Sequence, residues 1–363
     1  MDGVVVKRYR VDGGRNDKCY LSLISPQDLS PKVLRENLNL PPHIEDDGIE
    51  CSSCGGLLYL DDYEGNIMLC NLTTKEMKFL PRPKLEPPPN KTFFDGSGLG
   101  YDSKSDDFKV IRNFHQRYYK IEDCGIKIYL GCEDHTELYS LKGGVWKSIP
   151  SPDATIGPSN GVYVSGSCYW LAGIHSSFDG PSSNVILSFD FTKESFHVLH
   201  KPQSTEEYSN LVFNLVEYHG SLGAIGYELS GISKCFELWV REDKTWAKVF
   251  DILLSGVERP LGLKDGRLLF LEGRKRRSNQ LSQLVVYDWI ANEWKKLDIY
   301  DYPYQMNVAF YVESQVALPD ASPMQSILHD EEEKDEERRT KFWFADEEND
   351  DYEKEEEEEC LAH

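Results

Sequence analysis

The sequence lacks an apolar run long enough to cross a membrane. Its first twenty residues, MDGVVVKRYRVDGGRNDKCY, also lack an apolar signal core followed by a small-residue cleavage site. We therefore expect no membrane partner and a cytoplasmic location, with the nucleus as the alternative. A disulfide framework is lacking too, because nine cysteines, an odd number, are scattered along 363 residues. We interpret the cysteines as reduced thiols buried in strands.

Catalytic and cofactor fingerprints are also absent. The sequence contains no G-x-S-x-G, H-E-x-x-H, P-loop or dinucleotide-binding motif. We therefore predict that the protein is not an enzyme and uses no cofactor. Basic side chains are outnumbered as well, with 40 Lys and Arg against 62 Asp and Glu, which gives a formal net charge of −22. Binding to nucleic acid needs a basic face, so we do not expect it, whereas a basic protein target is electrostatically favoured.

The acidic charge is concentrated near the C-terminus. Residues 330–359 contain 18 acidic and 5 basic side chains. A run of like charge with few apolar residues cannot bury enough surface to order itself. We therefore predict one folded domain over residues 1–320, followed by a disordered acidic tail over residues 321–363.

What the sequence does contain is a repeat. Five segments share an anchor residue, four turn-like residues and a bulky residue six positions after the anchor: NLTTKEMKFL, SLKGGVWKSI, DFTKESFHVL, VREDKTWAKV and DWIANEWKKL, which begin at residues 71, 140, 190, 240 and 288. The bulky residues are Met77, Trp146, Phe196, Trp246 and Trp294. Because they recur in register, we predict that they pack one repeat against the next. In four of the repeats a glycine opens an apolar run: Gly55, Gly166, Gly220 and Gly266.

The repeat predicts an all-β fold. Most of the distances in sequence from one bulky residue to the next are close to 50 residues. Each repeat unit consists of short strands rich in aromatic and β-branched residues. This period is typical of a kelch-like β-propeller blade. The segments KCYLSLIS from Lys18 and MNVAFYVES from Met306 read as further strands, so we expect the two chain ends to close one blade. Six blades are predicted, with seven as the alternative.

Several segments resemble the plant F-box-associated domain, in the order that the family has them. They are CNLTTKEMKFLPRP, GLGYDSKSDDFKVIR, ELYSLKGGVWKSI, GVYVSGSCYWLAG, ILSFDFTKESFHVL, ELWVREDKTWAKVF and YVESQVALP. The resemblance spans about residues 18–318 and is similar in particular to the S-locus F-box group, which acts in pollen recognition and self-incompatibility.

The resemblance implies the substrate-recognition part of a Skp–cullin–F-box (SCF) ubiquitin ligase. In that family an N-terminal F-box docks on a Skp-type adaptor, and the associated domain holds the protein to be ubiquitinated. The F-box pattern is not found in this sequence. We therefore expect a protein target as partner, with adaptor and cullin as partners only if an F-box is supplied. A sugar-binding or catalytic propeller and a truncated, non-functional relative remain the alternatives.

Two segments between strands are the candidate target contacts, because propellers bind through connections on one face. The first is the long insertion from His115, with candidate residues His115, Arg117, Tyr118 and Tyr119. The second is HSSFDGPSSN, with candidate residues His175, Phe178 and Asp179.

Other motifs have a plainer interpretation. CSSC at Cys51–Cys54 has no second ligand pair and is not expected to bind a metal. His197 and His200, three apart on a predicted strand, point to opposite faces and cannot share an ion. GRKRR from Gly273 is interpreted as a surface loop between two strands, with nuclear import or anion binding as the less favoured reading.

Overall fold

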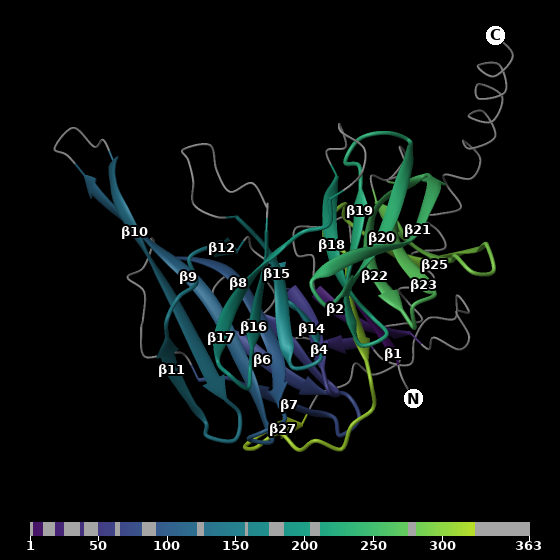
Figure 1. Cartoon of the computed structure of the whole chain (residues 1–363). Helices are drawn as coiled ribbons and strands as arrows, with labels where there is room; N and C mark the ends of the chain where they lie inside the picture. The colour runs from purple at the N-terminus through teal and green to yellow at the C-terminus, as the bar shows by residue number, and fades with distance from the viewer. Residues whose placement is uncertain are drawn as a thin grey trace, which may run out of the picture.

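The computed structural model describes residues 3–9, 19–24, 37–39, 50–61, 66–81, 92–121, 127–156, 159–173, 185–203, 211–274 and 281–323. In this part of the chain all regular structure is β, and the strands form six sheets. The sheets are arranged as the blades of a propeller (Figure 1). The predicted six-bladed all-β propeller is therefore confirmed.

Blades 1 to 3 follow one another along the chain. Blade 1 contains β4 (Glu50–Cys54), β5 (Leu57–Asp61), β6 (Ile67–Asn71), β7 (Glu76–Phe79) and β27 (Ser322–Pro323). Blade 2 contains β8 (Thr92–Asp102), β9 (Asp107–Ile121), β10 (Lys127–Ser140), β11 (Val145–Ile149) and β13 (Ser159–Asn160). Blade 3 contains β12 (Thr155–Ile156), β14 (Val162–Val164), β15 (Ser167–Gly173), β16 (Val185–Asp190) and β17 (Ser195–His200).

Blades 4 to 6 complete the ring. Blade 4 contains β18 (Val212–Tyr218), β19 (Ser221–Tyr227), β20 (Ser233–Glu242) and β21 (Thr245–Ser255). Blade 5 contains β22 (Val257–Lys264), β23 (Leu268–Gly273), β24 (Ser282–Asp288) and β25 (Glu293–Asp301). Blade 6 contains β26 (Asn307–Tyr311), β1 (Gly3–Tyr9), β2 (Cys19–Ile24) and β3 (Asn37–Asn39).

Blade 6 joins the two ends of the chain. Its inner strand β26 comes from the C-terminal part and pairs antiparallel with β1 near the N-terminus, with Val5 opposite Ala309. Such pairing satisfies the backbone groups of both strands and removes two sheet edges. The predicted composite blade is therefore present. Farther along the chain, β27 pairs with β7 of blade 1, so the sheet structure continues to residue 323.

The inner strands surround a central channel. In the ring each contacts the next, in the order β26, β4, β8, β14, β18, β22 and back to β26. Each inner strand follows the outer strand of the preceding blade, so all inner strands begin at the same end of the channel. We call this end the upper face; it also carries the connections between the second and third strands of each blade.

The glycines of the repeat lie in tight turns between the first and second strands. Both turn residues have positive φ in the pairs Ser165–Gly166, His219–Gly220 and Asp265–Gly266. Positive φ at both positions defines the type I′ turn, whose twist matches that of antiparallel strands. In blade 1 the turn is Gly55–Gly56, so the equivalent glycine there is Gly56, one residue after the predicted Gly55.

The polar anchor of the repeat has a physical role in the turn to the outer strand. The Asp190 carboxylate accepts hydrogen bonds from the backbone N–H groups of Thr192 and Lys193, both at 2.9 Å. Asp288 and Asn71 accept equivalent bonds two and three residues ahead. A side chain that satisfies the backbone in this way specifies the turn.

The fourth copy of the repeat is aligned incorrectly. Val240 pairs with Ala247 inside the sheet and is buried, whereas the turn runs from Glu242 to Thr245. Because this turn is two residues shorter than the others, counting six positions back from Trp246 reaches the strand instead of the anchor.

The five bulky residues nevertheless occupy equivalent positions. Each is the second residue of the outer strand of its blade. Met77, Trp146, Phe196 and Trp246 pack against apolar clusters shared between neighbouring blades. Trp294 is 46% exposed, and its ring contacts Tyr287 of its own blade at a centroid distance of 4.5 Å. Tyr287 belongs to the apolar cluster shared by blades 4 and 5. The packing role of Trp294 between blades therefore stays a prediction.

Residues 324–363, which include most of the predicted acidic tail, lie outside the described residues. No helix in the described ranges is long and apolar enough to span a membrane.

Candidate functional site

The insertion from His115 is a strand pair. His115, Arg117, Tyr118 and Tyr119 all lie in β9, which runs without a break to Ile121 and pairs with β10. We expected this insertion between strands to be a contact loop, and that expectation is wrong. In an antiparallel ladder alternate residues exchange backbone hydrogen bonds with their cross-strand partners, so an insertion can extend a hairpin instead of forming a loop.

The β9–β10 hairpin extends beyond its blade. Pairing of β8 with β9 ends at Gln116, and pairing of β11 with β10 ends at Thr136. Beyond these points the two strands continue as a ribbon that projects from the upper face (Figure 1). The second candidate segment, with His175, Phe178 and Asp179, lies outside the described residues. It connects β15 to β16, the same position in blade 3 that the hairpin turn has in blade 2.

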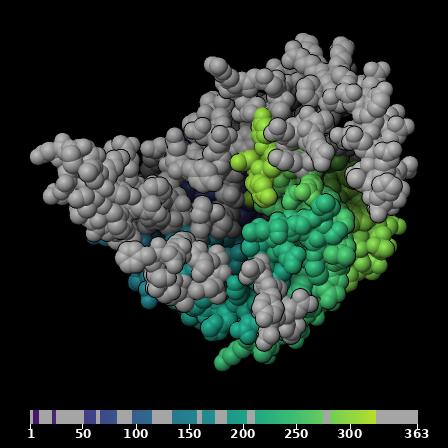
Figure 2. Space-filling model, turned by 90° about the horizontal axis from the view of Figure 1, so that it is seen from above, coloured from purple at the N-terminus to yellow at the C-terminus, as the bar shows by residue number. Residues whose placement is uncertain are grey.

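Apolar side chains are exposed on the same face. Leu229 and Ile232, in the connection between β19 and β20, are 63% and 69% exposed. The connection is held by the buried Lys234, whose ammonium donates to the carbonyl oxygen of Leu229 at 3.1 Å and to Glu258 at 2.9 Å. Figure 2 looks down on this face, where blade 4 forms a broad green surface. Sequence analysis missed these residues, although two large apolar residues in a turn, ELSGI, were a visible signal.

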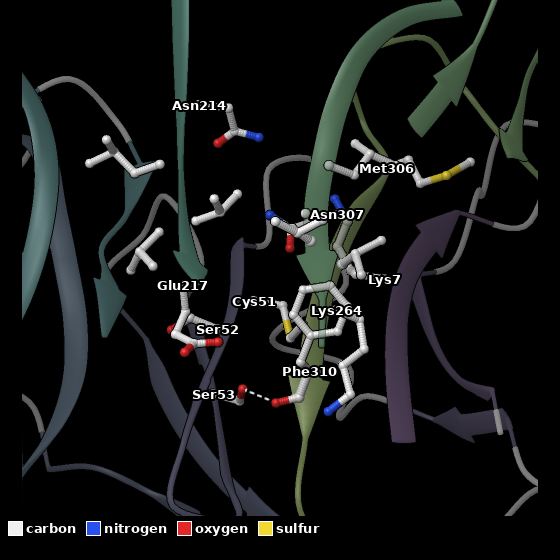
Figure 3. Close-up of a pocket in the computed structure, with 18 of the residues that line it drawn as sticks. Lys7, Cys51, Ser52, Ser53, Asn214, Glu217, Lys264, Met306, Asn307 and Phe310 are labelled. Atoms are coloured by element: carbon white, nitrogen blue, oxygen red, sulfur yellow. Dashed lines mark hydrogen bonds between the residues drawn. The ribbon is translucent and has the colours of Figure 1, made fainter. Parts of the chain in front are cut away.

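A cavity of about 560 Å³ occupies the channel (Figure 3). It is lined by the inner strands β4, β14, β18, β22 and β26, with Lys7 from β1. A cavity of this size is in the range of small-molecule sites. Its upper part contains Arg259, Asn214, Gln305, Asn307 and Lys7.

Arg259 is held at the upper end by three contacts. Its Nε donates to Glu272 at 2.6 Å, and its Nη2 donates to the carbonyl oxygen of Met306 at 2.9 Å. The guanidinium lies 5.7 Å from the ring centre of Tyr304. Glu272 is fully buried and also accepts the backbone N–H of Tyr304 at 2.8 Å. Arg259 therefore has a defined position, which sequence analysis did not identify.

The charged side chains in the lower part of the channel have partners of their own. Lys264 lies 3.5 Å from Asp265, and its ammonium is 5.9 Å from the ring of Phe310. Glu217 accepts the backbone N–H of Gly220 in the neighbouring turn. The charges at this end therefore balance one another or serve the turns.

The described residues give no support to a metal site. No cluster of three or more His, Cys, Asp or Glu side chains able to hold an ion occurs among them. Cys51 and Cys54 lie on β4 and belong to two different apolar clusters. Burial raises the pKa of the Cys54 thiol to about 12, so the thiolate that a metal needs is not formed near neutral pH.

The histidine pair and the basic segment that the sequence analysis singled out lie on or beside strands. His197 and His200 are on β17, and both are exposed. Gly273 ends β23, and Arg274 lies 3.4 Å from Glu258, while residues 275–277 of the basic segment are outside the described ranges. No histidine lines the described part of the channel cavity, and the Ser53 hydroxyl donates to the carbonyl oxygen of Phe310. These positions show no nucleophile activated by a base.

Comparison with known proteins places these features in a family. A family model described as "F-box associated beta propeller domain" matches residues 12–259. The Arabidopsis thaliana F-box/kelch-repeat protein At3g23880 is 28% identical over 61% of this chain and 58% of its own length. The F-box protein CPR1 of the same plant is 25% identical over 73% of this chain and 67% of its own length. The chain thus spans about three fifths of the length of the first of these relatives.

Solved structures are similar at a lower level. A chain of a nidogen/laminin complex is 11% identical, with 86% of this chain and 100% of that chain covered and a TM-score of 0.42.

The family match ends inside β22, whereas the structure shows that the propeller continues through β26.

Proposed function

Because this chain belongs to the F-box-associated β-propeller family, we propose that it is the target-binding part of an SCF-type ubiquitin ligase substrate receptor. The relatives are F-box proteins, which supports a role in protein interaction without catalysis by the propeller itself. The target is held on the upper face.

One observation carries the choice of face. The β9–β10 hairpin is extended well beyond the other strands of its blade, on the face where Leu229 and Ile232 are also exposed. A two-stranded ribbon is marginally stable alone, and exposed apolar side chains mark interaction surfaces. A projecting ribbon and two exposed apolar side chains on one face suit contact with a protein surface.

A shortened hairpin tests this proposal. Gln116 and Glu133 are direct cross-strand partners, so residues 117–132 can be replaced by Asn-Gly, which favours a two-residue type I′ turn. With an F-box fused to the N-terminus, affinity purification and mass spectrometry should recover adaptor, cullin and target. The shortened variant should recover adaptor and cullin but lose the target.

Two controls make the result decisive. The melting temperature of the shortened variant should match that of the parent, because the removed ribbon lies beyond the blade pairing. Unchanged target capture by a folded, shortened variant would contradict the choice of face. Capture of the adaptor by the propeller without an F-box would contradict the assignment of adaptor binding to the F-box and of target binding to the propeller.

Finer features of the function are supported by sequence alone. A basic target fits the net charge of −22, and an S-locus F-box-like role fits the segments quoted above. A cytoplasmic or nuclear location is part of the same proposal. Imaging of a tagged chain tests the location, and expression restricted to pollen would be required for the S-locus role.

A further inference from the structure

We propose that the upper part of the channel is a carboxylate-binding site, with Arg259 as its main ligand-binding residue and Lys7 as a second cation. The proposal goes beyond target binding on the upper face and does not depend on it. The ligand is defined by its chemistry: a carboxylate from a protein segment or from a small organic acid.

The first argument is the set of groups that line the upper cavity. Lys7 and Asn307 are direct cross-strand partners, and Arg259 bonds to Met306, the residue before Asn307. Lys7 and Asn307 are drawn together at the cavity in Figure 3. Two cations are thus brought to one side of the channel, although they lie far apart in the sequence. Among the described lining residues, the carboxylates Glu217 and Asp265 are at the opposite, lower end.

The second argument is the number of donors that Arg259 retains. Within the described part of the chain, its bonds to Glu272 and Met306 use two of the five N–H groups of the guanidinium. The side chain lines the cavity and is 25% exposed. Glu272 is fully buried behind it and fixes its orientation. A planar guanidinium with free donors binds a carboxylate strongly, often through two parallel bonds.

The third argument is that the residues around Arg259 are held in fixed positions. Tyr304 has a φ of +67°, a conformation that costs an L-residue energy. The bond from its backbone N–H to Glu272 holds it there, and its ring, on a residue that is 63% exposed, flanks Arg259 at the channel mouth.

The net charge of the chain is −22, which does not favour an acidic ligand. Bulk electrostatics would repel an acidic ligand, so affinity for a carboxylate must come from short-range bonds to Arg259 and its neighbours. Such bonds persist at salt concentrations that screen the overall field, where the Debye length is about 8 Å at 0.15 M.

The test uses two probes at 0.15 M salt: a fluorescent hexaglutamate peptide measured by anisotropy and glutarate measured as its competitor and by direct titration. The double substitution R259Q/E272Q keeps a hydrogen-bonded pair of similar size but removes both charges. It should weaken binding of the recognised probe at least tenfold. The matched control R267Q/D288N neutralises an arginine–aspartate pair outside the channel lining, where Arg267 Nε donates to Asp288 at 2.6 Å, and should leave binding unchanged.

A second variant protects the test against misfolding. Tyr304→Gly suits the positive φ and removes the ring, so it should fold as the parent does and weaken binding about threefold. Failure of both probes to bind the parent chain would overturn the proposal, as would equal loss of binding in R259Q/E272Q and R267Q/D288N.

The remaining arms identify the source of the carboxylate. Binding of the peptide alone indicates a protein segment, and binding of glutarate alone indicates a small organic acid; either result supports the site. Deleting residues 330–363 tests whether the acidic stretch of this chain is itself the ligand. Tighter probe binding after the deletion would show that it competes, and unchanged binding would assign the site to an external ligand.

Discussion

The indole Nε1 of Trp246 donates a hydrogen bond of 2.9 Å to the carbonyl oxygen of His200, which belongs to the preceding blade. Trp146 makes the same kind of bond, at 2.7 Å, to the carbonyl oxygen of Pro81, just after the outer strand of the blade before it. The repeated tryptophan therefore links blades through a specific bond as well as through apolar packing. Trp294, at the equivalent position, is 46% exposed.

The first prediction compares these tryptophans. Trp246→Phe and Trp146→Phe should each lower the free energy of unfolding by about 1 kcal/mol, because one hydrogen bond is lost. Trp294→Phe should change it by less than about 0.5 kcal/mol, as is usual for surface substitutions. Urea unfolding of the three variants measures the difference, and an equal cost at all three positions would contradict the assigned contacts.

The second prediction concerns the type I′ turns. At Gly166, with φ +90°, an added Cβ would meet nothing within 4 Å, so Gly166→Ala should cost only the backbone strain of about 1–2 kcal/mol. At Gly56, with φ +84°, an added Cβ would lie 2.1 Å from the Cβ of Ser314. Gly56→Ala should therefore cost clearly more. Thermal unfolding of both variants measures the two costs. A larger loss of stability for Gly166→Ala than for Gly56→Ala would refute this account.

The third prediction concerns pH. Burial acts to raise the pKa of Asp102, but hydrogen bonds from Lys109 at 2.7 Å and from Ser105 outweigh it, so the pKa lies well below its usual range. A depressed pKa stabilises the fold above the unfolded value near 3.8, and this stability is lost as pH falls toward the folded value. Asp102→Asn should cost about 2–3 kcal/mol at pH 7, the worth of a bond to a charged group.

The measurement is the difference in unfolding free energy between parent and Asp102→Asn at pH 7 and at pH 3. Subtraction cancels the other carboxylates, so the gap should shrink at pH 3. A gap that stays constant would show that the charge of Asp102 does not contribute.

The fourth prediction contrasts two C-terminal deletions. Removing residues 330–363 should shift the melting temperature by less than about 2 °C, since a sequence so rich in charge offers little apolar surface to bury. Removing residues 306–363 deletes β26, which pairs with β1, and Tyr311, whose hydroxyl bonds to Asn71 and Thr73 of blade 1. That deletion should abolish cooperative unfolding. Calorimetry of both shortened chains provides the test.

The fifth prediction concerns association with the target. If the target is basic, its association rate constant should fall as salt rises from 0.05 to 0.5 M, because screening shortens the range of attraction. Dissociation should change less. Surface plasmon resonance measures both rates once a target is captured, and a salt-independent association rate would argue against a basic target.

Much of the fold is encoded locally and could be predicted. An anchor such as Asp190 bonds to the backbone two and three residues ahead, and Gly166 supplies a φ that other residues avoid. Both signals act over a few residues, so their spacing reveals the repeat without any knowledge of tertiary contacts. The shorter turn at Glu242–Thr245 shifted one alignment because the length of a turn is not visible from its flanking residues.

The β9–β10 hairpin shows where local signals end. Nothing within the segment from His115 distinguishes a long loop from a ribbon, because strand pairing depends on the partner segment across the turn and on its register. Trp294 shows the same for exposure, since the repeat places it at the position of Trp146 and Trp246 but does not reveal that it is 46% exposed.

By itself the sequence determined the all-β repeat and favoured six blades over seven, because these rest on turn chemistry and on short apolar strands that can be recognised along the chain. The family was indicated separately, by the resemblance of the quoted segments. Only the tertiary structure decided which residues share a site. Lys7 and Arg259 come together because β26 pairs with β1 and lies beside β22. Ring closure joins distant segments through backbone hydrogen bonds that carry no signature of the side chains they bring to the channel.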